Sequence, residues 1–392
     1  MAASVDGEDE LEFAWDQEHA DFRARLRAFI ARELPDDWVT VSGGLDNSGP
    51  GTAAFALEFC PRLADAGLLI PHWPKEWGGD AVDPWHHWIL GEEMWEVGEP
   101  RSYQYMNVNW AGPALFAFGT EDQINTHIPR IRAGKIYYCQ GFSEPEAGSD
   151  LASLRTRAEP TDTGYLINGS KIWTSAASFA DYCVLLARTG GEGRHGITVF
   201  LIPMDLPGIN VRVVPGVQGV RSLHQVFLDN VEVPASMVLG EENKGWDVVR
   251  HILFNERIGS PGYSFVIKGL DSAVALLKAR GLWTRADVRA RAAQVRAACE
   301  AARLMAYKVI DDRVKNLPPT AETSLGHYAQ AHAGRLFCDF VGDFLQDALL
   351  SAEDPMLSMA YRRVGAAGLV AGSAEIQLDI AATELLGLPR GT

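Results

Sequence analysis

The spacing of apolar residues changes twice along the chain, and this change limits the fold more than any other feature. Before about residue 138, apolar residues recur at the spacing typical of helices, as at Phe22, Leu26 and Phe29. Between about 140 and 235 they alternate instead, in short runs rich in β-branched residues and separated by glycine-containing turns. After Gly245 the helical spacing returns and continues toward the end of the chain.

Strands that follow one another without intervening helices favour an antiparallel sandwich or barrel over a dinucleotide-binding parallel sheet. The later helical pattern predicts helices over about 323–350 and 357–386, and a helix opened by a capping box at Thr284–Asp287. We therefore predict an α+β protein with an N-terminal helical domain over 1–138, a middle antiparallel β domain over 139–240 and a C-terminal helical domain over 241–392.

The charge balance limits the partners of the chain. Of its 392 residues, 35 are Lys or Arg and 51 are Asp or Glu, so the formal net charge is −16. Such a protein repels nucleic acid and anionic membranes, and we expect neither as a main ligand. Any polyanionic ligand would need a local positive site. Since no apolar run approaches the roughly 20 residues of a membrane span and the acidic start lacks a signal-peptide layout, we expect a soluble cytoplasmic protein.

Several common kinds of catalytic or metal site are missing from the sequence. The five cysteines are scattered without a Cys-x-x-Cys pair, which argues against metal clusters and disulfide frameworks. His86 and His87 are adjacent, so they leave a helix on different faces and make poor joint ligands. The chain also lacks the glycine-rich dinucleotide fingerprint, a P-loop, a Gly-x-Ser-x-Gly elbow and a His-Glu-x-x-His pair. We therefore expect no bound metal and none of these hydrolase chemistries.

Two segments near the start of the β region could carry chemistry. Gly141–Asp150 surrounds a rigid proline with small and hydroxyl-bearing residues, whose backbone N–H groups could approach a flat ring or an anion. An ordinary surface loop would have a similar composition. Gly169–Ser175 contains Trp173 followed by two hydroxyl residues. This tryptophan could belong to the core, or it could stack on a ring beside hydrogen-bond donors.

These segments and several others resemble the signature motifs of the acyl-CoA dehydrogenase family. The resemblance implies the fold of that family, FAD as the cofactor, and α,β-dehydrogenation of an acyl thioester as the reaction. The motifs occur in the order typical of the family, and they are Trp73–Gly79, Gly119–Gln123, Tyr138–Asp150, Ile167–Ser175, Leu228–Pro234, Gly372–Gln377 and Leu386–Arg390.

The resemblance also implies which residues contact the flavin. The loop that begins at Gln140 would lie along the cofactor, and Ser149 at its end would also contact the thioester. Trp173 would cover the isoalloxazine ring, and the two hydroxyl residues after it would donate hydrogen bonds near N5 and O4 that favour reduction. The start of the C-terminal helix, with its free N–H groups, would lie beside the cofactor. The implied cofactor-binding residues are therefore Gln140, Phe142, Ser143, Ser149, Trp173, Thr174, Ser175, Gly372, Ser373 and Glu375.

In this family a carboxylate removes the α-proton while the β-hydrogen leaves as hydride, and the carboxylate occupies one of two positions. One branch has it directly before the C-terminal Gly-Thr/Ser motif, where this chain has Ala371. The other has it before an arginine in the first helix after the β domain, where this chain has Glu256. A Glu–Arg pair on a helix can also be a solvated face. The resemblance implies Glu256 as the catalytic base, with substrate contacts from Phe254, Asn255 and Arg257.

Moving the base changes the wall of the acyl pocket. Family members with the helix position handle branched, long or bulky acyl groups, because the opposite wall carries no carboxylate. In this chain that wall would be small, since it is formed by Ala366, Ala367, Gly368 and Ala371. We therefore expect a branched or ring-bearing acyl group on coenzyme A or an acyl carrier protein. The implied electron acceptor is an electron-transfer flavoprotein.

Two elements of the family pattern are missing. Ala279–Arg285 stands in place of the Arg-x-x-Phe-Gly element that reaches the FAD of the neighbouring subunit, and the Gly-Gly-x-Gly loop is missing from about 346–356. The basic run 278–296 would be a solvated helix face or a support for phosphates. Three interpretations stay open: a homodimeric or homotetrameric dehydrogenase, a related flavin oxidase or monooxygenase, and a partly structural subunit of a hetero-oligomer.

Overall fold

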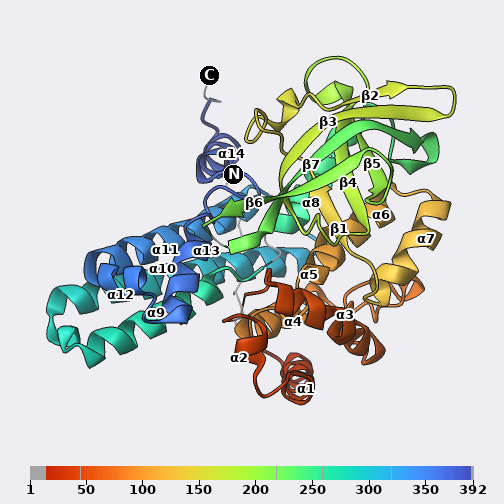
Figure 1. Ribbon diagram of the computed structural model, residues 1–392. Helices are drawn as coiled ribbons and strands as arrows, with labels where there is room; N and C mark the ends of the chain where they lie inside the picture. The colour runs from red at the N-terminus through yellow and green to blue at the C-terminus, as the bar shows by residue number, and fades with distance from the viewer. Residues whose placement is uncertain (1–14, 45, 218, 258–259, 319, 390–392) are drawn as a thin grey trace, which may run out of the picture.

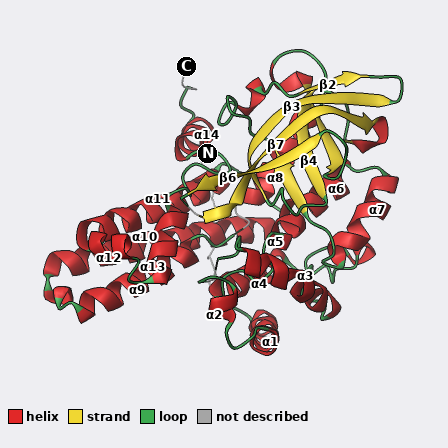
Figure 2. Cartoon of the chain, in the orientation of Figure 1, coloured by secondary structure: helices red, strands yellow, loops and turns green. Residues whose placement is uncertain are grey.

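The computed structural model describes residues 15–44, 46–217, 219–257, 260–318 and 320–389. Helices formed by the first part of the chain, a β-sheet formed by the middle and helices formed by the last part follow one another (Figure 1). This order confirms the predicted fold class. Figure 2 shows most of the sheet on one side of the molecule, and the long C-terminal helices extend toward the other side. No helix in the described ranges combines the length and apolarity that crossing a membrane requires.

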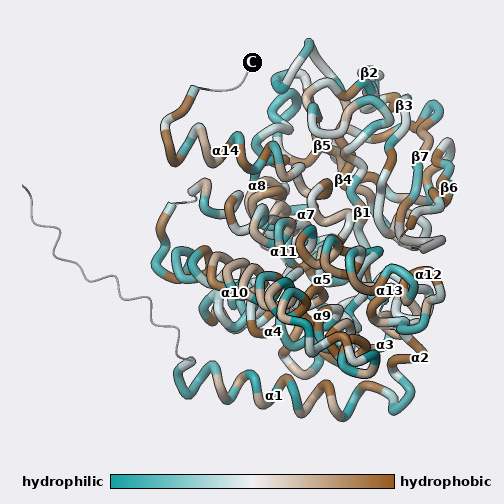
Figure 3. Tube along the Cα trace, turned by 90° about the vertical axis from the view of Figure 1, so that its left-hand side faces the viewer, coloured by the Kyte–Doolittle hydropathy of each residue, from teal (hydrophilic) through white to brown (hydrophobic). Residues whose placement is uncertain are grey.

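The N-terminal helices follow the predicted apolar spacing. α1 begins after Asp16, whose carboxylate accepts a backbone N–H of the first turn, and it buries Phe22, Leu26 and Phe29 along one face. Figure 3 shows the resulting alternation of hydrophobic and hydrophilic segments along α1. The helices of this region are α1 (Gln17–Glu33), α2 (Trp38–Val41), α3 (Pro50–Asp65), α4 (Pro84–Glu96), α5 (Gln104–Met106), α6 (Gly112–Phe118) and α7 (Glu121–Arg132).

The middle region is an eight-stranded sheet among the described residues, in the order β6-β7-β3-β2-β4-β5-β8, with β1 paired to β4. Most neighbours are antiparallel, as predicted, but β1 and β2 each pair with β4 in parallel. Both exceptions involve strands connected by the long loop 142–156. The strands are β1 (Tyr138–Gly141), β2 (Arg157–Pro160), β3 (Gly164–Ser175), β4 (Tyr182–Arg188), β5 (Ile197–Pro203), β6 (Ile209–Gly216), β7 (Gly219–Pro234) and β8 (Val238–Leu239).

The C-terminal region is helical, but both long helices predicted here are split. The predicted helix 357–386 is interrupted by a turn in which Ala371 and Gly372 have left-handed φ angles of 53° and 97°, which an α-helix cannot contain. The predicted helix 323–350 is interrupted at Leu345. The helices are α8 (Gly245–Arg257), α9 (Tyr263–Ala279), α10 (Ala286–Val314), α11 (Glu322–Phe344), α12 (Gln346–Ser351), α13 (Pro355–Val364) and α14 (Ala374–Leu386).

The predicted capping box at Thr284–Asp287 is wrong. α10 begins at Ala286 after Arg285, and no side chain caps its first turn. The Thr284 hydroxyl donates instead to the Gly281 carbonyl at 3.1 Å. The Asp287 carboxylate accepts two hydrogen bonds from the Arg285 guanidinium. Because Arg285 and not Thr284 is the N-cap residue, the Thr284 hydroxyl is not placed to cap the helix.

Three hydrophobic cores, formed by residues that the structure describes, connect these regions. The first joins the N-terminal helices to one face of the sheet and to α8, and it includes Tyr138 and Ile252. The second covers the other face of the sheet around Phe200. The third lies among the C-terminal helices and includes Trp88 and Trp95 of α4. Because α4 is shared between two of these cores, the helical regions pack directly on one another beside the sheet.

Candidate active site

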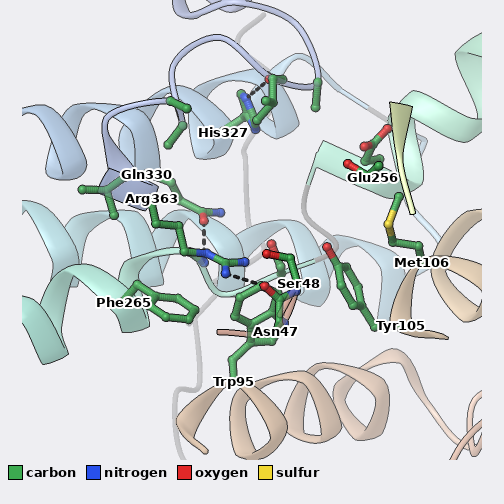
Figure 4. A pocket seen from close by; sticks show the side chains of 18 of the residues that line it. Asn47, Ser48, Trp95, Tyr105, Met106, Glu256, Phe265, His327, Gln330 and Arg363 are labelled. Carbon is green, nitrogen blue, oxygen red and sulfur yellow. Dashed lines mark hydrogen bonds between the residues drawn. The ribbon is translucent and has the colours of Figure 1, made fainter. Parts of the chain in front are cut away.

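A cavity of about 270 Å³ lies where the three regions meet. Its wall is built by the loop before α3, by α4, α8, α9, α11 and α13, and by the ends of β3 and β7. Figure 4 shows side chains from several of these elements around the cavity. Of the residues singled out from the sequence, the cavity is lined by Ser175, Glu256, Ala366, Ala367 and Ala371.

Glu256 lies in the last turn of α8 and is partly buried against the cavity (Figure 4). Its Oε2 accepts a hydrogen bond from Nε2 of Gln140, a residue of β1, at 3.2 Å. Val249 and Ile252 of α8 are fully buried in the core that also contains Tyr138 of β1. The apolar face of α8 therefore fixes the helix against the strand that supplies the amide.

The turn between α13 and α14 forms another part of the wall. Ala371 lines the cavity, and its carbonyl and that of Gly372 accept hydrogen bonds from the buried Gln377 amide. Ser373 caps α14 by accepting the Ile376 N–H. These bonds hold the two left-handed residues, Ala371 and Gly372, in place before α14. Because residue 371 is an alanine, this wall presents a methyl group to the cavity and not a carboxylate.

A buried ion pair fixes the loop that follows β1. The ammonium of Lys171, fully buried, donates to the Glu144 carboxylate at 2.7 Å and to the Phe142 carbonyl at 3.1 Å. Glu144 also accepts the backbone N–H groups of Arg155 and Thr156. Burial outweighs the attraction of Glu144 and lowers the pKa of Lys171 to about 8. Burial opposes ionisation of Glu144 as well, but Lys171 and the hydrogen bonds outweigh it and lower the pKa of this carboxyl.

The end of β3 leaves regular pairing with β7 at Trp173. The register shifts between Lys171 and Thr174, and Trp173 has a left-handed φ of 62° with 56% of its surface exposed. Nδ1 of His224 donates to the Thr174 carbonyl at 3.1 Å. The Thr174 hydroxyl is buried and has no hydrogen-bond partner among the described residues. An exposed indole therefore stands beside a buried, unsatisfied hydroxyl, an arrangement that suits a flat hydrogen-bonding ligand.

Other predicted site residues lie outside the cavity wall. Ser149 is exposed in the loop after β1, and Glu375 is exposed in the first turn of α14. On α8, the ring of Phe254 packs against a guanidinium from α10, and the Asn255 amide donates to a carbonyl one turn earlier. The side chain of Arg257 lies outside the described residues.

Sequence reasoning missed most of the polar residues that line the cavity. Asn109 comes from a π-helical turn, Asn107–Ala111, and Arg363 comes from α13. No local pattern separates Arg363 from the exposed Arg362 before it, because only the packing of α13 directs one of them into the cavity. The missed residues are Asn47, Ser48, Tyr103, Tyr105, Asn109, His327, Gln330 and Arg363.

The adjacent His86 and His87 point into different clusters, in agreement with the helix geometry expected from the sequence. His86 and His19 both contact the Asp83 carboxylate, and these three residues offer metal-ligand atoms within 4.8 Å of one another. Asp83 also caps α4 by accepting two backbone N–H groups, so hydrogen bonding accounts for this cluster. His87 instead packs against His72, with ring centroids 3.8 Å apart and the ring planes tilted by 36°.

The basic run 278–296 is largely paired within the chain. Arg280 contacts Asp347 and Glu353 at 2.9 and 2.6 Å, and Arg291 contacts an aspartate of α11 at 3.0 Å. These arginines are partly exposed. The pairing favours a solvated, ion-paired helix face for this run.

Three family models match consecutive parts of the chain. They describe the N-terminal, middle and C-terminal domains of acyl-CoA dehydrogenase, and they match residues 16–135, 139–231 and 243–386. Together the three matches follow the order of helices, sheet and helices seen in the fold.

Curated relatives match over most of the chain. Acyl-CoA dehydrogenase IpdE1 of Mycobacterium tuberculosis is 33% identical, and the alignment covers 95% of this chain and 99% of that protein. Acyl-CoA dehydrogenase FadE34 of the same species is 34% identical over 94% of this chain but over only 52% of its own sequence.

Solved structures share the whole fold. The Tcur3481-Tcur3483 steroid ACAD has a TM-score of 0.83 and 30% identity, and the match covers 96% of this chain and 99% of that chain. The ChsE4-ChsE5 complex from Mycobacterium tuberculosis has a TM-score of 0.83 and 27% identity, covering 97% of this chain and 100% of that chain.

Proposed function

The chain belongs to the acyl-CoA dehydrogenase family, whose members are flavoprotein oxidoreductases, and from this premise we propose its reaction. It removes hydrogen from the α and β carbons of an acyl thioester, with FAD as the cofactor and Glu256 as the base. The thioester is an acyl-CoA or an acyl group on a carrier protein. The relatives named above as acyl-CoA dehydrogenases support this general activity.

The observation that carries the proposal is the position of Glu256. Among the described residues that line the cavity, Glu256 is the one with a carboxylate side chain. The alternative position for a base, Ala371, lines the same cavity with a methyl group, which cannot accept a proton. One carboxylate is therefore available to take the α-proton.

The surroundings of Glu256 suit a base. The Gln140 amide donates to one of its oxygens and restricts the orientation of the carboxylate. Met106 and Leu223 line the same cavity, and a bound acyl group would displace water from it. A carboxylate that loses water gains basicity toward a weakly acidic α-proton, so closure over the substrate would favour proton transfer to Glu256.

The end of β3 supports FAD as the cofactor. The buried Thr174 hydroxyl, which has no partner among the described residues, and the neighbouring Ser175 offer hydrogen-bond donors to a flavin ring. The exposed indole of Trp173 offers a flat face beside them. FAD, when bound, supplies the acceptor for the β-hydride. The loop from Gln140 to Ser149 and the residues Gly372, Ser373 and Glu375 would hold the rest of the cofactor.

A branched or ring-bearing acyl group fits the small side chains of one wall. Ala366, Ala367 and Ala371 line the cavity, whereas Gly368 packs near Ala331 and Ala374. The similarity to a protein described as a steroid ACAD supports a bulky, ring-bearing substrate.

An oligomeric assembly is part of the proposal. Helix α14 packs against α11 and lies at the edge of the fold (Figures 1 and 3). Large apolar side chains are exposed on and after α14, and an unpaired apolar helix face favours burial by another subunit. These exposed apolar side chains are Ile376, Leu378, Leu385, Leu386 and Leu388. The other subunit can be a second copy of this chain or a different, related chain. The missing Arg-x-x-Phe-Gly element and the likeness to the ChsE4-ChsE5 complex support both kinds of assembly equally. The proposed electron acceptor is an electron-transfer flavoprotein.

Anaerobic titration of the purified protein with a panel of acyl-CoAs tests the proposal. Loss of the oxidised flavin absorbance on adding a branched or ring-bearing acyl-CoA supports it, and the panel identifies the acyl class. Straight-chain C4–C8 acyl-CoAs turning over far better than branched analogues would overturn the acyl class alone. Rapid reoxidation in air would favour an oxidase or monooxygenase. A colourless protein that stays colourless with added FAD would favour a structural subunit.

A further inference from the structure

The proposed base occupies a position in α8 that needs support from other elements. Glu256 is the second-to-last residue of this helix, which ends at Arg257. The last four carbonyl groups of an α-helix have no partner within the helix, and in α8 they begin with that of Phe254. Helix ends open at little cost in free energy, so a base in a last turn keeps one direction only where other elements hold that turn. On the side of the sheet, the Gln140 amide holds the carboxylate itself.

Arg313 of α10 holds the last turn of α8 through two contacts with Phe254, two residues before Glu256. Its Nη2 donates to the Phe254 carbonyl at 3.3 Å, and its Cζ lies 4.9 Å from the centroid of the Phe254 ring. The guanidinium therefore contacts both the backbone and the side chain of one residue, which restricts displacement and rotation of the turn. A cation at the C-terminal end of a helix also interacts favourably with the helix dipole.

The charge of Arg313 is compensated differently from that of other arginines of α10. Arg296 and Arg303 both pair with Glu300 of the same helix, at 3.3 and 2.7 Å. Arg313 is partly buried, and burial lowers its pKa to about 10 without an opposing carboxylate among the described residues, so it stays charged at neutral pH. Burying a charge costs free energy unless a polar group compensates it. The carbonyl end of α8 supplies that group through Phe254.

We propose that Arg313 is a positioning residue for the reaction: it fixes the last turn of α8 and thereby keeps the Glu256 carboxylate directed into the cavity. Gln140 and Arg313 then hold the base from two sides, one through the carboxylate and the other through the backbone that carries it. Arg313 is not among the residues that line the cavity, so it acts through α8 and does not touch the substrate. This inference rests on the proposed dehydrogenation and deepens it.

The first test measures the order of the helix end and does not depend on the reaction. Amide hydrogen exchange of the FAD-bound protein is followed by mass spectrometry in the wild type and in Arg313→Met, which removes the charge and the donors. We expect the last turn of α8 to exchange at least about threefold faster in the variant, while the first turns of α8 keep the wild-type rate. Arg296→Met, on the same helix α10, should match the wild type throughout. Unchanged exchange in the last turn of α8 of Arg313→Met overturns the inference.

The second test measures proton removal. Stopped-flow mixing follows anaerobic reduction of the bound flavin by an acyl-CoA that reduces the wild type. We expect the limiting rate per bound flavin to fall at least about tenfold in Arg313→Met, because a displaced base transfers a proton poorly, while the half-saturating substrate concentration changes less than about threefold. Deuterium at the α-carbon should slow the variant at least as much as the wild type. A limiting rate within about twofold of the wild type, or a rate insensitive to α-deuteration, overturns the inference.

Further variants separate positioning from a requirement for folding. Arg313→Lys keeps the cation and one donor but loses the planar fork, so we expect a limiting rate between those of the wild type and Arg313→Met. A rate below that of Arg313→Met counts against the inference. If Arg313→Met does not bind FAD, Arg313→Gln takes its place with the same expected results. Failure of both variants to bind FAD would show that the fold itself requires the arginine, and it would overturn the positioning role.

The failure of this inference is distinguishable from failure of the proposed function. If no acyl thioester reduces the flavin of the wild type, the dehydrogenase proposal fails and the positioning role fails with it, whatever the hydrogen exchange shows. If the wild-type flavin is reduced and Arg313→Met reacts at the wild-type rate, the dehydrogenase proposal stands and the role of Arg313 is refuted.

Discussion

The amide of Gln140 donates a hydrogen bond to the carboxylate of Glu256 across 3.2 Å of space and 116 residues of sequence. One residue lies on the first strand of the sheet and the other on the last turn of the helix that follows the sheet. The bond therefore connects the region expected to contact the flavin with the proposed base. Its formation requires α8 to pack against the core that contains β1, which the buried Val249 and Ile252 ensure.

Loss of this hydrogen bond should slow proton abstraction. Replacing Gln140 by methionine keeps the volume and removes the donor that orients the Glu256 carboxylate. A hydrogen bond to a charged group contributes about 1.5–3 kcal/mol, so we expect flavin reduction to slow by roughly ten- to 100-fold in stopped-flow measurements. Gln225→Met on β7 serves as the matched control. A rate for Gln140→Met within twofold of the wild type would contradict a positioning role.

The ion pair beneath the loop after β1 should matter for stability. Glu144→Gln leaves the ammonium of the fully buried Lys171 without its counter-charge, and breaking a buried pair from one side costs about 3 kcal/mol or more. We expect the free energy of unfolding, measured by denaturant titration, to fall by that amount and FAD affinity to weaken. The neighbouring Glu146, exposed and paired with an exposed Arg155, is the control, and Glu146→Gln should change stability by less than about 0.5 kcal/mol. Equal effects of the two substitutions would argue against this account.

The Thr174 hydroxyl offers a test of the flavin site that does not depend on activity. Because this buried hydroxyl has no partner among the described residues, Thr174→Val should leave the stability of the FAD-free protein nearly unchanged. The same variant should bind FAD roughly three- to tenfold more weakly in equilibrium titrations, since a donor to the ring is lost. Thr198→Val is the opposite control, because the Thr198 hydroxyl accepts the Asn243 N–H and its loss should lower stability without changing FAD affinity. Unchanged FAD affinity in Thr174→Val would remove the hydroxyl from the cofactor site.

The buried, adjacent rings of His72 and His87 should make the protein sensitive to acid. Burial, and then repulsion from nearby cations, lowers the pKa of His87 to about 3, and burial followed by repulsion from His87 lowers that of His72. The unfolded chain therefore binds protons at a higher pH than the folded chain does. As the pH falls from about 6.5 toward 3, the free energy of unfolding decreases by up to about 1.4 kcal/mol per pH unit for each histidine. His87→Gln should flatten this slope, measured by denaturant titration between pH 4 and 7, and the exposed His195→Gln should not. An unchanged slope in His87→Gln would contradict the assignment.

Much of the fold could be predicted from the sequence because it depends on local periodicity. The change from helical to alternating spacing near residue 140 located the sheet, and the return of helical spacing located α8 and the later helices. Periodicity could not predict the turn between α13 and α14, because apolar residues continue through it in helical register while Ala371 and Gly372 take left-handed conformations. It also could not predict that α10 would begin after Arg285, one residue too late for Thr284 to be its N-cap residue.

The residues of the candidate site that lie in contiguous motifs could be proposed from the sequence, and the others could not. Gln140, Trp173 and Thr174 occur in recognisable segments, so a sequence pattern can suggest them. The far wall of the cavity depends on how separate helices pack, and Arg363 differs from Arg362 only in the direction that α13 gives it. The same is true of Asn109, which reaches the cavity through a π-helical turn without a distinctive sequence.

Anaerobic flavin reduction by the Glu256→Gln variant tests the central claim most directly. The substitution keeps the size of the side chain and its ability to hydrogen-bond, but it removes the basic oxygen. With an acyl-CoA that bleaches the wild-type flavin, we expect the variant to retain bound FAD and to reduce it at least about 1,000-fold more slowly, while Glu232→Gln on the exposed face of β7 behaves like the wild type. Bleaching of the Glu256→Gln flavin at the wild-type rate would contradict the account.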